Sequence, residues 1–165
     1  RSAGQIPTYY NALRIGRPYT PGKPGNYTSQ YFEEEQGALY PFGFGLSFST
    51  FTLTDLKLSA SRIRRGEKLT AEATLTNTGS FAGANVVQLY IADPYASIAR
   101  PVKELKGFQK VTLKPGESRA VHFEVGPEQL KFVNGELKEV IESGQFDVQL
   151  GLDSRDVLQQ SFHLV

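Results

Sequence analysis

The stretch Leu69-Thr70-Ala71-Glu72-Ala73-Thr74-Leu75 decides the fold, because apolar and polar residues alternate through it without interruption. Side chains of a β-strand point alternately to the two faces of a sheet, so the pattern predicts a strand with one face in a core and one in solvent. Asn77-Thr78-Gly79 follows directly and predicts a turn. An exposed sheet face of this kind is typical of antiparallel sheets.

The same alternation recurs along the chain after residue 50. Val87, Leu89 and Ile91 share one face of a predicted strand, which Asp93-Pro94 ends. Other segments with strand character are 53–58, 105–113 with an expected bulge at Gly107, 121–125, 132–133, 137–140, 146–152 and 158–164.

Turn signals separate these segments. Lys114-Pro115-Gly116-Glu117 has proline and glycine at the two central positions that a type II turn requires, and Pro127–Leu130 predicts one helical turn. Asn134-Gly135 is the strongest short hairpin signal in the chain. Residues 51–165 therefore predict an all-β fold, an immunoglobulin-like or fibronectin type III-like β-sandwich of seven or eight strands.

Residues 1–50 have a different composition. They hold 12 of the 25 glycines and prolines, 6 of the 8 tyrosines and only 7 of the 35 charged residues. Proline and glycine at this density predict an extended, mostly irregular segment, and it is too aromatic for a free linker. We expect it to lie flat against a folded surface and to bury its rings, with Glu33-Glu34-Glu35 in a solvated loop.

Composition excludes several functions. The net charge of +1 argues against nucleic acid and against an anionic membrane surface as partners. Cysteine is absent, which excludes disulfides, thiolate metal sites and cysteine nucleophiles. The two histidines, His122 and His163, fall on the outward phase of their strands, so we expect solvated residues and no base. Without methionine or a signal peptide, the chain reads as a piece of a longer polypeptide.

Two features leave alternatives open. Asp153-Ser154-Arg155-Asp156 reads as a turn between strands, with a calcium site as the less favoured interpretation. The tyrosine-rich segment suits a carbohydrate platform, since sugars stack on flat rings, but packing of the segment onto the fold is favoured because the chain has no tryptophan. No serine lies in a G-x-S-x-G nucleophile elbow.

The run Leu39-Tyr40-Pro41-Phe42-Gly43-Phe44-Gly45-Leu46-Ser47-Phe48-Ser49-Thr50-Phe51 resembles the L-Y-P-F-G-[YF]-G-L-S-[YF]-T-x-F signature of glycoside hydrolase family 3. In that family it enters a C-terminal fibronectin type III-like domain. The resemblance covers essentially the whole chain and is nearest to bacterial periplasmic β-glucosidases. Further segments that carry it are 4–11, 16–19, 27–32, 76–79, 82–84, 87–90 and 100–108.

The resemblance implies a parent enzyme that hydrolyses β-glucosides with retention, using a nucleophilic Asp and an acid/base Glu. Neither matches here, so no catalytic, substrate-binding or metal residue is carried over, and no cofactor is implied. Residues 1 to about 35 would be the tail of a preceding α/β domain and the start of a connector. The resemblance divides the chain into 1–50, tail and connector, and 51–165, the sandwich, in a periplasmic or secreted protein.

The bulky rings of the first segment are candidates for docking. Tyr40, Phe42 and Phe44, with Tyr9 and Tyr10, would fasten the sandwich to the catalytic domains of the parent. The predicted function is a non-catalytic accessory domain that stabilises those domains, with a homodimer contact as a further partner. The alternative is a carbohydrate-binding module that targets the enzyme to β-glucan. An independent adhesion-type sandwich fits the signature less well, and hydrolysis by this chain alone contradicts the need for two placed carboxylates.

Overall fold

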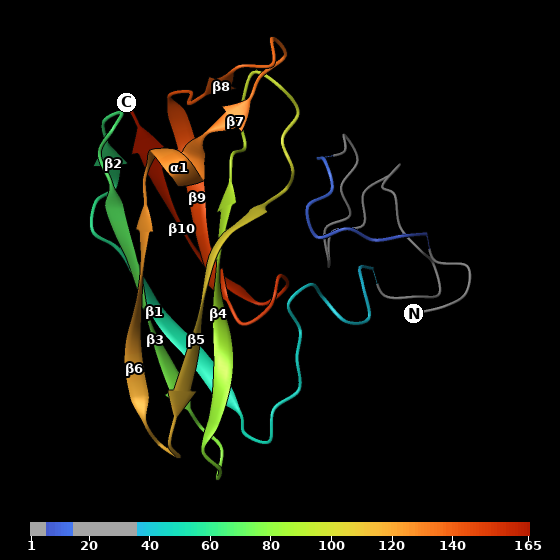
Figure 1. Cartoon of the computed structure of the whole chain (residues 1–165), viewed down its shortest axis with the longest axis vertical. Coiled ribbons are helices and arrows are strands. Elements are labelled where there is room, and N and C mark those ends of the chain that lie inside the picture. Colours follow the sequence, from blue (N-terminus) through green and yellow to red (C-terminus); the bar gives the residue numbers. More distant parts are fainter. Residues whose placement is uncertain (1–5, 15–35) are drawn as a thin grey trace.

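The computed structural model describes residues 6–14 and 36–165, and it is a two-layer β-sandwich (Figure 1). One sheet has three strands in the order β1-β3-β6, and the other has five in the order β2-β10-β9-β4-β5. The seven long strands are β1 (Phe51–Leu58), β3 (Leu69–Asn77), β4 (Gly83–Ala92), β5 (Glu104–Leu113), β6 (Ser118–Val125), β9 (Gly144–Gly151) and β10 (Val157–Leu164).

Three two-residue strands and one helical turn complete the described elements. β2 (Arg62–Ile63) pairs in parallel with the end of β10, and β7 (Phe132–Val133) pairs with β8 (Glu139–Val140). The helical turn α1 (Pro127–Leu130) lies where the sequence predicts it. The all-β sandwich is confirmed, and its seven long strands agree with the predicted number.

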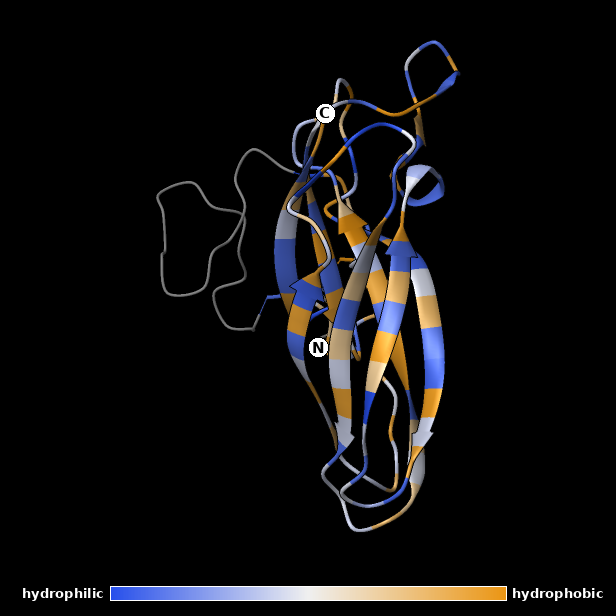
Figure 2. Cartoon of the chain, turned by 90° about the vertical axis from the view of Figure 1, so that its left-hand side faces the viewer, coloured by the Kyte–Doolittle hydropathy of each residue, from blue (hydrophilic) through white to orange (hydrophobic). Residues whose placement is uncertain are grey.

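The core fills the space between the two sheets, and the alternation of β3 supplies four of the twenty buried residues that the structure describes there. Leu69, Ala71, Ala73 and Leu75 are buried, while the residues between them are partly exposed. Figure 2 shows the same alternation of hydrophobic and hydrophilic residues along the other strands. The facing sheet contributes a second apolar layer from Val87, Leu89, Ile91, Phe146, Val148, Leu150, Phe162 and Leu164.

Two irregularities lie where the sequence indicates them. The pairing of β4 with β5 steps from Leu89–Gly107 to Tyr90–Leu105, which leaves Lys106 as the extra residue of a bulge. Gly116 has φ +74, and the Glu117 amide donates to the Lys114 carbonyl at 3.0 Å, as in the predicted type II turn.

The hairpin that Asn134-Gly135 predicts is confirmed, with a longer loop than the dipeptide favours. Its loop spans the five residues 134–138, and the strand expected from Leu137 begins only at Glu139. The Asn134 side chain organises the loop, because its Oδ1 accepts the amides of Glu136 and Lys138 at 2.9 and 3.1 Å. Leu137 adopts the left-handed conformation, with φ 61. Local side-chain hydrogen bonding therefore overrides the dipeptide preference.

Asn77 ties the segment before β1 to both sheets. Its side chain is completely buried at the end of β3, and Oδ1 accepts the Ser49 hydroxyl at 2.6 Å and the Gly79 amide at 3.0 Å. The Nδ2 group donates to the carbonyls of Phe81 and Leu113 at 2.8 and 3.1 Å. All four hydrogen-bonding positions of the amide are used, so the residue fixes the chain immediately upstream of β1.

Arg100 holds the long loop between β4 and β5. The guanidinium is buried, lies 4.2 Å from the centre of the Phe132 ring and pairs with Glu104. Asp93 lies 3.8 Å away, and its burial raises the pKa of its carboxyl while Arg100 opposes that shift. The arginine that opens the 100–108 segment thus has a structural role in joining the loop to the β7–β8 hairpin.

Candidate docking surface

The connector, residues 36–50, passes the β9–β10 loop and runs to the start of β1 (Figure 1). Its central feature is a turn in which the Phe44 amide donates to the Pro41 carbonyl at 3.0 Å. Gly43 has φ +80 at the third position, where a type II turn requires glycine. A β-carbon there would also overlap the Gln88 side-chain amide. The glycine therefore sets the path of the connector.

Backbone hydrogen bonds fasten the connector to the β9–β10 loop. The Ser154 amide donates to the Phe42 carbonyl at 2.9 Å, and the Arg155 guanidinium donates to the Ala38 carbonyl. Lys103, in the loop between β4 and β5, also binds this loop, because its Nζ donates to the Ser154 carbonyl at 2.9 Å. Asp153–Asp156 is thus a turn that positions the connector. A turn is also the interpretation that the sequence favours over a calcium site.

The connector covers the outer face of β4. Gln88 and Tyr90 point away from the core, yet both are buried, and Gln88 Nε2 donates to the carbonyls of Gly43 and Leu152 at 3.3 and 2.8 Å. The Tyr90 hydroxyl donates to Gln88 Oε1. Burial raises the pKa of Tyr90 to about 12, and burial likewise lowers the pKa of Lys103, whose ammonium lies 5.5 Å from the Tyr90 ring centre.

Residues 6–14 add a second layer to this arrangement. The Val102 amide donates to the Ala12 carbonyl at 2.8 Å, next to an isolated bridge between Leu13 and Pro101. The Tyr10 ring stacks on Phe42 at 4.1 Å between centroids and meets Tyr90 edge-on at 6.0 Å. Two segments distant in sequence are therefore joined through aromatic contacts on the outside of the sandwich.

The candidate docking residues divide into two groups. Tyr10 is half-buried and packs inward, whereas Tyr9 and Tyr40 are each 68% exposed. Phe42 and Phe44 keep slightly less than half of their surface exposed, and Tyr40 contacts Phe44 with ring centroids 5.3 Å apart. The expectation that this segment buries its rings therefore holds only in part.

Two further apolar side chains extend this exposed strip. Leu46 is 94% exposed and Phe48 is 97% exposed, on backbone that runs from the Gly43 turn to Ser49. Neither residue was among the predicted docking residues, although both lie within the 39–51 signature. We define the aromatic docking surface as the exposed side chains Tyr40, Phe42, Phe44, Leu46 and Phe48.

Reactive chemistry is sparse in the part of the chain that the structure describes. No group of three or more potential metal ligands occurs among those residues, and none of their helices is long and apolar enough to cross a membrane. His122 and His163 are exposed, and His122 Nδ1 lies 3.2 Å from the Glu72 carboxylate. The predicted loop Glu33–Glu35 falls outside the described residues. The geometry of the described residues thus offers an exposed apolar surface for contact.

Comparisons with known proteins identify the chain's relatives. The fibronectin type III-like domain family matches residues 85–154. Over its full length the chain is 53% identical to a periplasmic β-glucosidase of Salmonella typhimurium and covers 22% of that protein. It is 40% identical, over 94% of its length, to a β-xylosidase of Formosa agariphila and covers 20% of it. The chain therefore spans about a fifth of the length of these relatives.

Solved structures agree with the sequences. A β-glucosidase from Listeria innocua, also crystallised with laminaribiose, superposes with a TM-score of 0.86 at 44% identity, over 98% of this chain and 22% of that one. The GH3 β-glucosidase of Bifidobacterium adolescentis gives a TM-score of 0.69 at 35% identity, over 76% of this chain and 18% of its own. The chain belongs to the fibronectin type III-like domains of the glycoside hydrolase family 3 β-glucosidases.

Proposed function

We propose that the chain is a non-catalytic accessory domain of a β-glucosidase and stabilises the catalytic domains of this parent enzyme by docking against them. The observation that carries the proposal is the aromatic docking surface, which is exposed on a segment whose backbone is fastened to the sandwich at Phe42, Gly43 and Ser49. Large exposed apolar patches on rigid backbone are typical of interaction sites.

The free energy available from covering this surface is large on the scale of domain stability. Complete burial of one Phe or Leu side chain contributes roughly 1.5–3 kcal/mol. Leu46 and Phe48 start almost fully exposed, so covering these two alone would contribute about 3–6 kcal/mol. Typical domain stabilities are about 5–15 kcal/mol, so docking could decide whether the parent enzyme is stable.

Tyr10 and Tyr9 take different parts in this proposal. Tyr10 positions Phe42 by stacking on it, while the exposed Tyr9 extends the contact area beside Tyr40. The parent would hydrolyse terminal β-glucosyl residues with retention, with its two catalytic carboxylates outside this chain. We further propose the division into 1–50, connector and tail of the preceding domain, and 51–165, a C-terminal sandwich, in a periplasmic or secreted enzyme.

A second function, carbohydrate binding, is favoured by one observation. Tyr9 and Tyr40 line a cavity of about 470 Å³ together with the polar residues Asn11 and Arg155. Exposed tyrosine rings beside amide and guanidinium donors suit a sugar, whose faces are apolar and whose edges carry hydroxyls. This function would use the same rings, so the two proposals need separate measurements.

The test compares the chain alone with the intact parent enzyme. The double variant Leu46→Ser and Phe48→Ser should leave the stability of the isolated chain within about 0.5 kcal/mol, because both side chains are already exposed. In the parent it should lower the melting temperature by several degrees, as should Tyr40→Ala with Phe42→Ala and Phe44→Ala. Tyr95→Ala is the matched control, since Tyr95 is 76% exposed outside the surface.

Unchanged melting temperature and activity of the parent in both multiple variants would refute docking. Calorimetric titration of the isolated chain with cello-oligosaccharides and laminaribiose tests the second function. Saturable heat that Tyr9→Ala and Tyr40→Ala abolish would establish carbohydrate binding, and absence of heat would leave docking as the function.

A further inference from the structure

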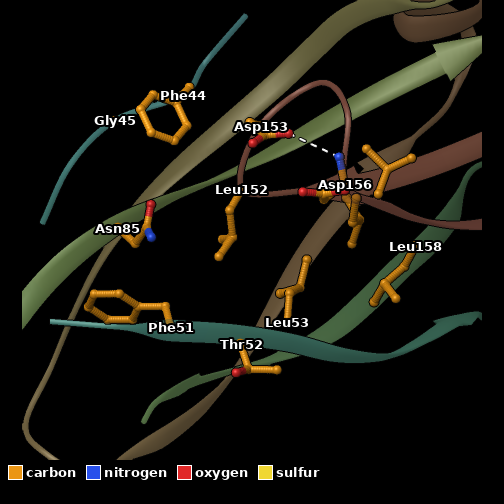
Figure 3. Close-up of a pocket in the computed structure, with 12 residues that line it drawn as sticks. Phe44, Gly45, Phe51, Thr52, Leu53, Asn85, Leu152, Asp153, Asp156 and Leu158 are labelled. Atoms are coloured by element: carbon orange, nitrogen blue, oxygen red, sulfur yellow. Dashed lines mark hydrogen bonds between the residues drawn. The ribbon is translucent and has the colours of Figure 1, made fainter. Parts of the chain in front are cut away.

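A cleft of about 560 Å³ opens at one side of the sandwich, between β1 and the β9–β10 loop (Figure 3). Leu53 and Leu158 lie on its floor, and the rings of Phe44 and Phe51 lie at one end. Asp153 and Asp156 lie on the loop that forms the opposite side. The cleft therefore combines an apolar floor, an aromatic end and two carboxylates.

The apolar floor is a part of the core that the two sheets leave uncovered. Phe51, Leu53, Leu152 and Leu158 pack against the core cluster and are only half-buried. β1 is an edge strand, and β2 pairs with β10 only at its last residues, His163 and Leu164. Among residues 6–14 and 36–165, no strand pairs with the first half of β10 on this side, and the core side chains reach the surface there.

The Asp156 carboxylate carries a charge that no hydrogen bond or ion pair of the described residues compensates, whereas the Asp153 carboxylate is hydrogen bonded within the loop. Asp153 Oδ1 accepts the amides of Arg155 and Asp156 at 2.7 and 3.0 Å, and within residues 6–14 and 36–165 the Asp156 carboxylate has neither a hydrogen bond nor an ion pair. Of the neighbouring cations, Arg155 donates to the Ala38 carbonyl, and Lys103 donates to the Ser154 carbonyl while its charge also acts on Asp153. Both aspartates line the cleft, and the Asp156 carboxylate is the one that the described residues leave without a partner.

The cleft is continuous with the aromatic docking surface, because Phe44 belongs to both. The chain spans about a fifth of its relatives, so most of a parent polypeptide lies outside it. We infer, resting on the proposed function, that the cleft takes a segment of the catalytic region of the parent. This segment lays an apolar side chain on Leu53 and Leu158 and presents an arginine or lysine to Asp153 and Asp156.

The chemistry of the cleft favours such a segment over a free sugar. The leucines of the floor offer no hydrogen-bonding groups to sugar hydroxyls, which would have to pair with Thr52, Asn85 and the two carboxylates, and any hydroxyl buried unpaired is unfavourable. An arginine side chain matches both features, because its methylene stem covers apolar surface while its guanidinium binds carboxylates.

Hydrogen exchange followed by mass spectrometry tests the inference on the isolated chain and on the intact parent. We expect peptides covering 51–58 and 152–158 to exchange more slowly in the parent, on the order of tenfold. Asp156→Lys should return these peptides to the rate of the isolated chain, while peptides covering 38–46 stay protected. Glu136→Lys, a charge reversal at the exposed hairpin loop, is the matched control and should change neither set.

Each outcome bears on one proposal. Equal exchange of the cleft peptides in chain and parent, with 38–46 protected, overturns the cleft inference and leaves docking intact. Equal exchange in both sets overturns docking as well. If added laminaribiose protects the cleft peptides in the isolated chain, and these peptides are not protected in the parent, the occupant of the cleft is a sugar and the inference of a polypeptide segment is overturned. Loss of protection in Glu136→Lys would show that charge acts non-locally and would also overturn the inference.

Discussion

Substitution of Asn77 should be among the most damaging single changes in the chain. Asn77→Ala removes the acceptor of the Ser49 hydroxyl and the Gly79 amide, and the donor to the carbonyls of Phe81 and Leu113. A buried polar group left without a partner costs about 1–3 kcal/mol. The bonds to Ser49 and Leu113 are buried and the other two part-buried, so the expected loss of unfolding free energy is about 4 kcal/mol.

A second variant separates hydrogen bonding from packing. Asn77→Asp conserves the side-chain volume but places a carboxylate oxygen against the carbonyls of Phe81 and Leu113, which need a donor. It should therefore be destabilising near neutral pH and partly recover below the pKa of the new carboxyl. Asn85→Ala is the matched control, because Asn85 is half-buried and its Oδ1 accepts a hydrogen bond from the neighbouring Val86 amide at 2.8 Å.

The assay is reversible urea unfolding of the isolated chain, followed by tyrosine fluorescence, since the chain has no tryptophan. Asn85→Ala should cost less than about 1 kcal/mol. If Asn77→Ala costs no more than this control, or if Asn77→Asp is as stable as the natural chain at neutral pH, the four hydrogen bonds do not stabilise the fold and the reasoning fails.

Three further predictions concern the connector and the long loop. Tyr90, with its pKa raised to about 12, should ionise after the exposed tyrosines in an ultraviolet titration. Its contribution to the free energy of unfolding should be complete below pH 10 and should fall as pH rises toward 12. Tyr90→Phe should remove the last phenol to titrate, and an unchanged titration curve would contradict the burial of Tyr90. The hydroxyl and the amide of Ser97 both donate to the Glu142 carboxylate and lower its pKa. Ser97→Ala removes the hydroxyl bond and should raise that pKa in an NMR titration of the carboxyl, and an unmoved pKa would exclude the bond in solution. The carboxylate stabilises the fold above its unfolded pKa of about 4.5, and this stabilisation is lost as pH falls through the lowered value. Gly43→Ala should lower the free energy of unfolding by about 1–2 kcal/mol for the left-handed backbone, and further because Gln88 must move. It should also speed the hydrogen exchange of residues 38–46, and an unchanged exchange rate would show that the turn does not fix the connector.

Alternation and turn chemistry made much of the sandwich predictable. β3 and β6 follow their patterns residue by residue, and the turn at Lys114–Glu117 depends only on local preferences. The alternation at β4 also assigned its inner face correctly, but it implied a solvated outer face. Gln88 and Tyr90 are buried there because a distant segment covers them, and no periodicity within β4 carries that information.

The candidate site was predictable in its residues and not in its geometry. The aromatic run indicated Tyr40, Phe42 and Phe44, but nothing local shows that Tyr10 would stack on Phe42 from thirty-two positions away. Leu46 and Phe48 were missed because an isolated apolar residue in sequence predicts burial, and their exposure becomes visible only once the neighbouring backbone is placed.

The buried polar groups beneath the connector explain why the docking surface can act at all. A free aromatic segment would lose about 1–2 kcal/mol of conformational freedom for each residue ordered on docking, which would cancel much of the gain from burying its rings. Gln88 and Ser154 donate hydrogen bonds to the Gly43 and Phe42 carbonyls of the turn before any partner arrives, and Asn77 holds the other end of the connector through Ser49. Polar residues on the outer face of β4 therefore contribute preorganisation, and this is the physical reason for placing them where simple alternation would leave them in water.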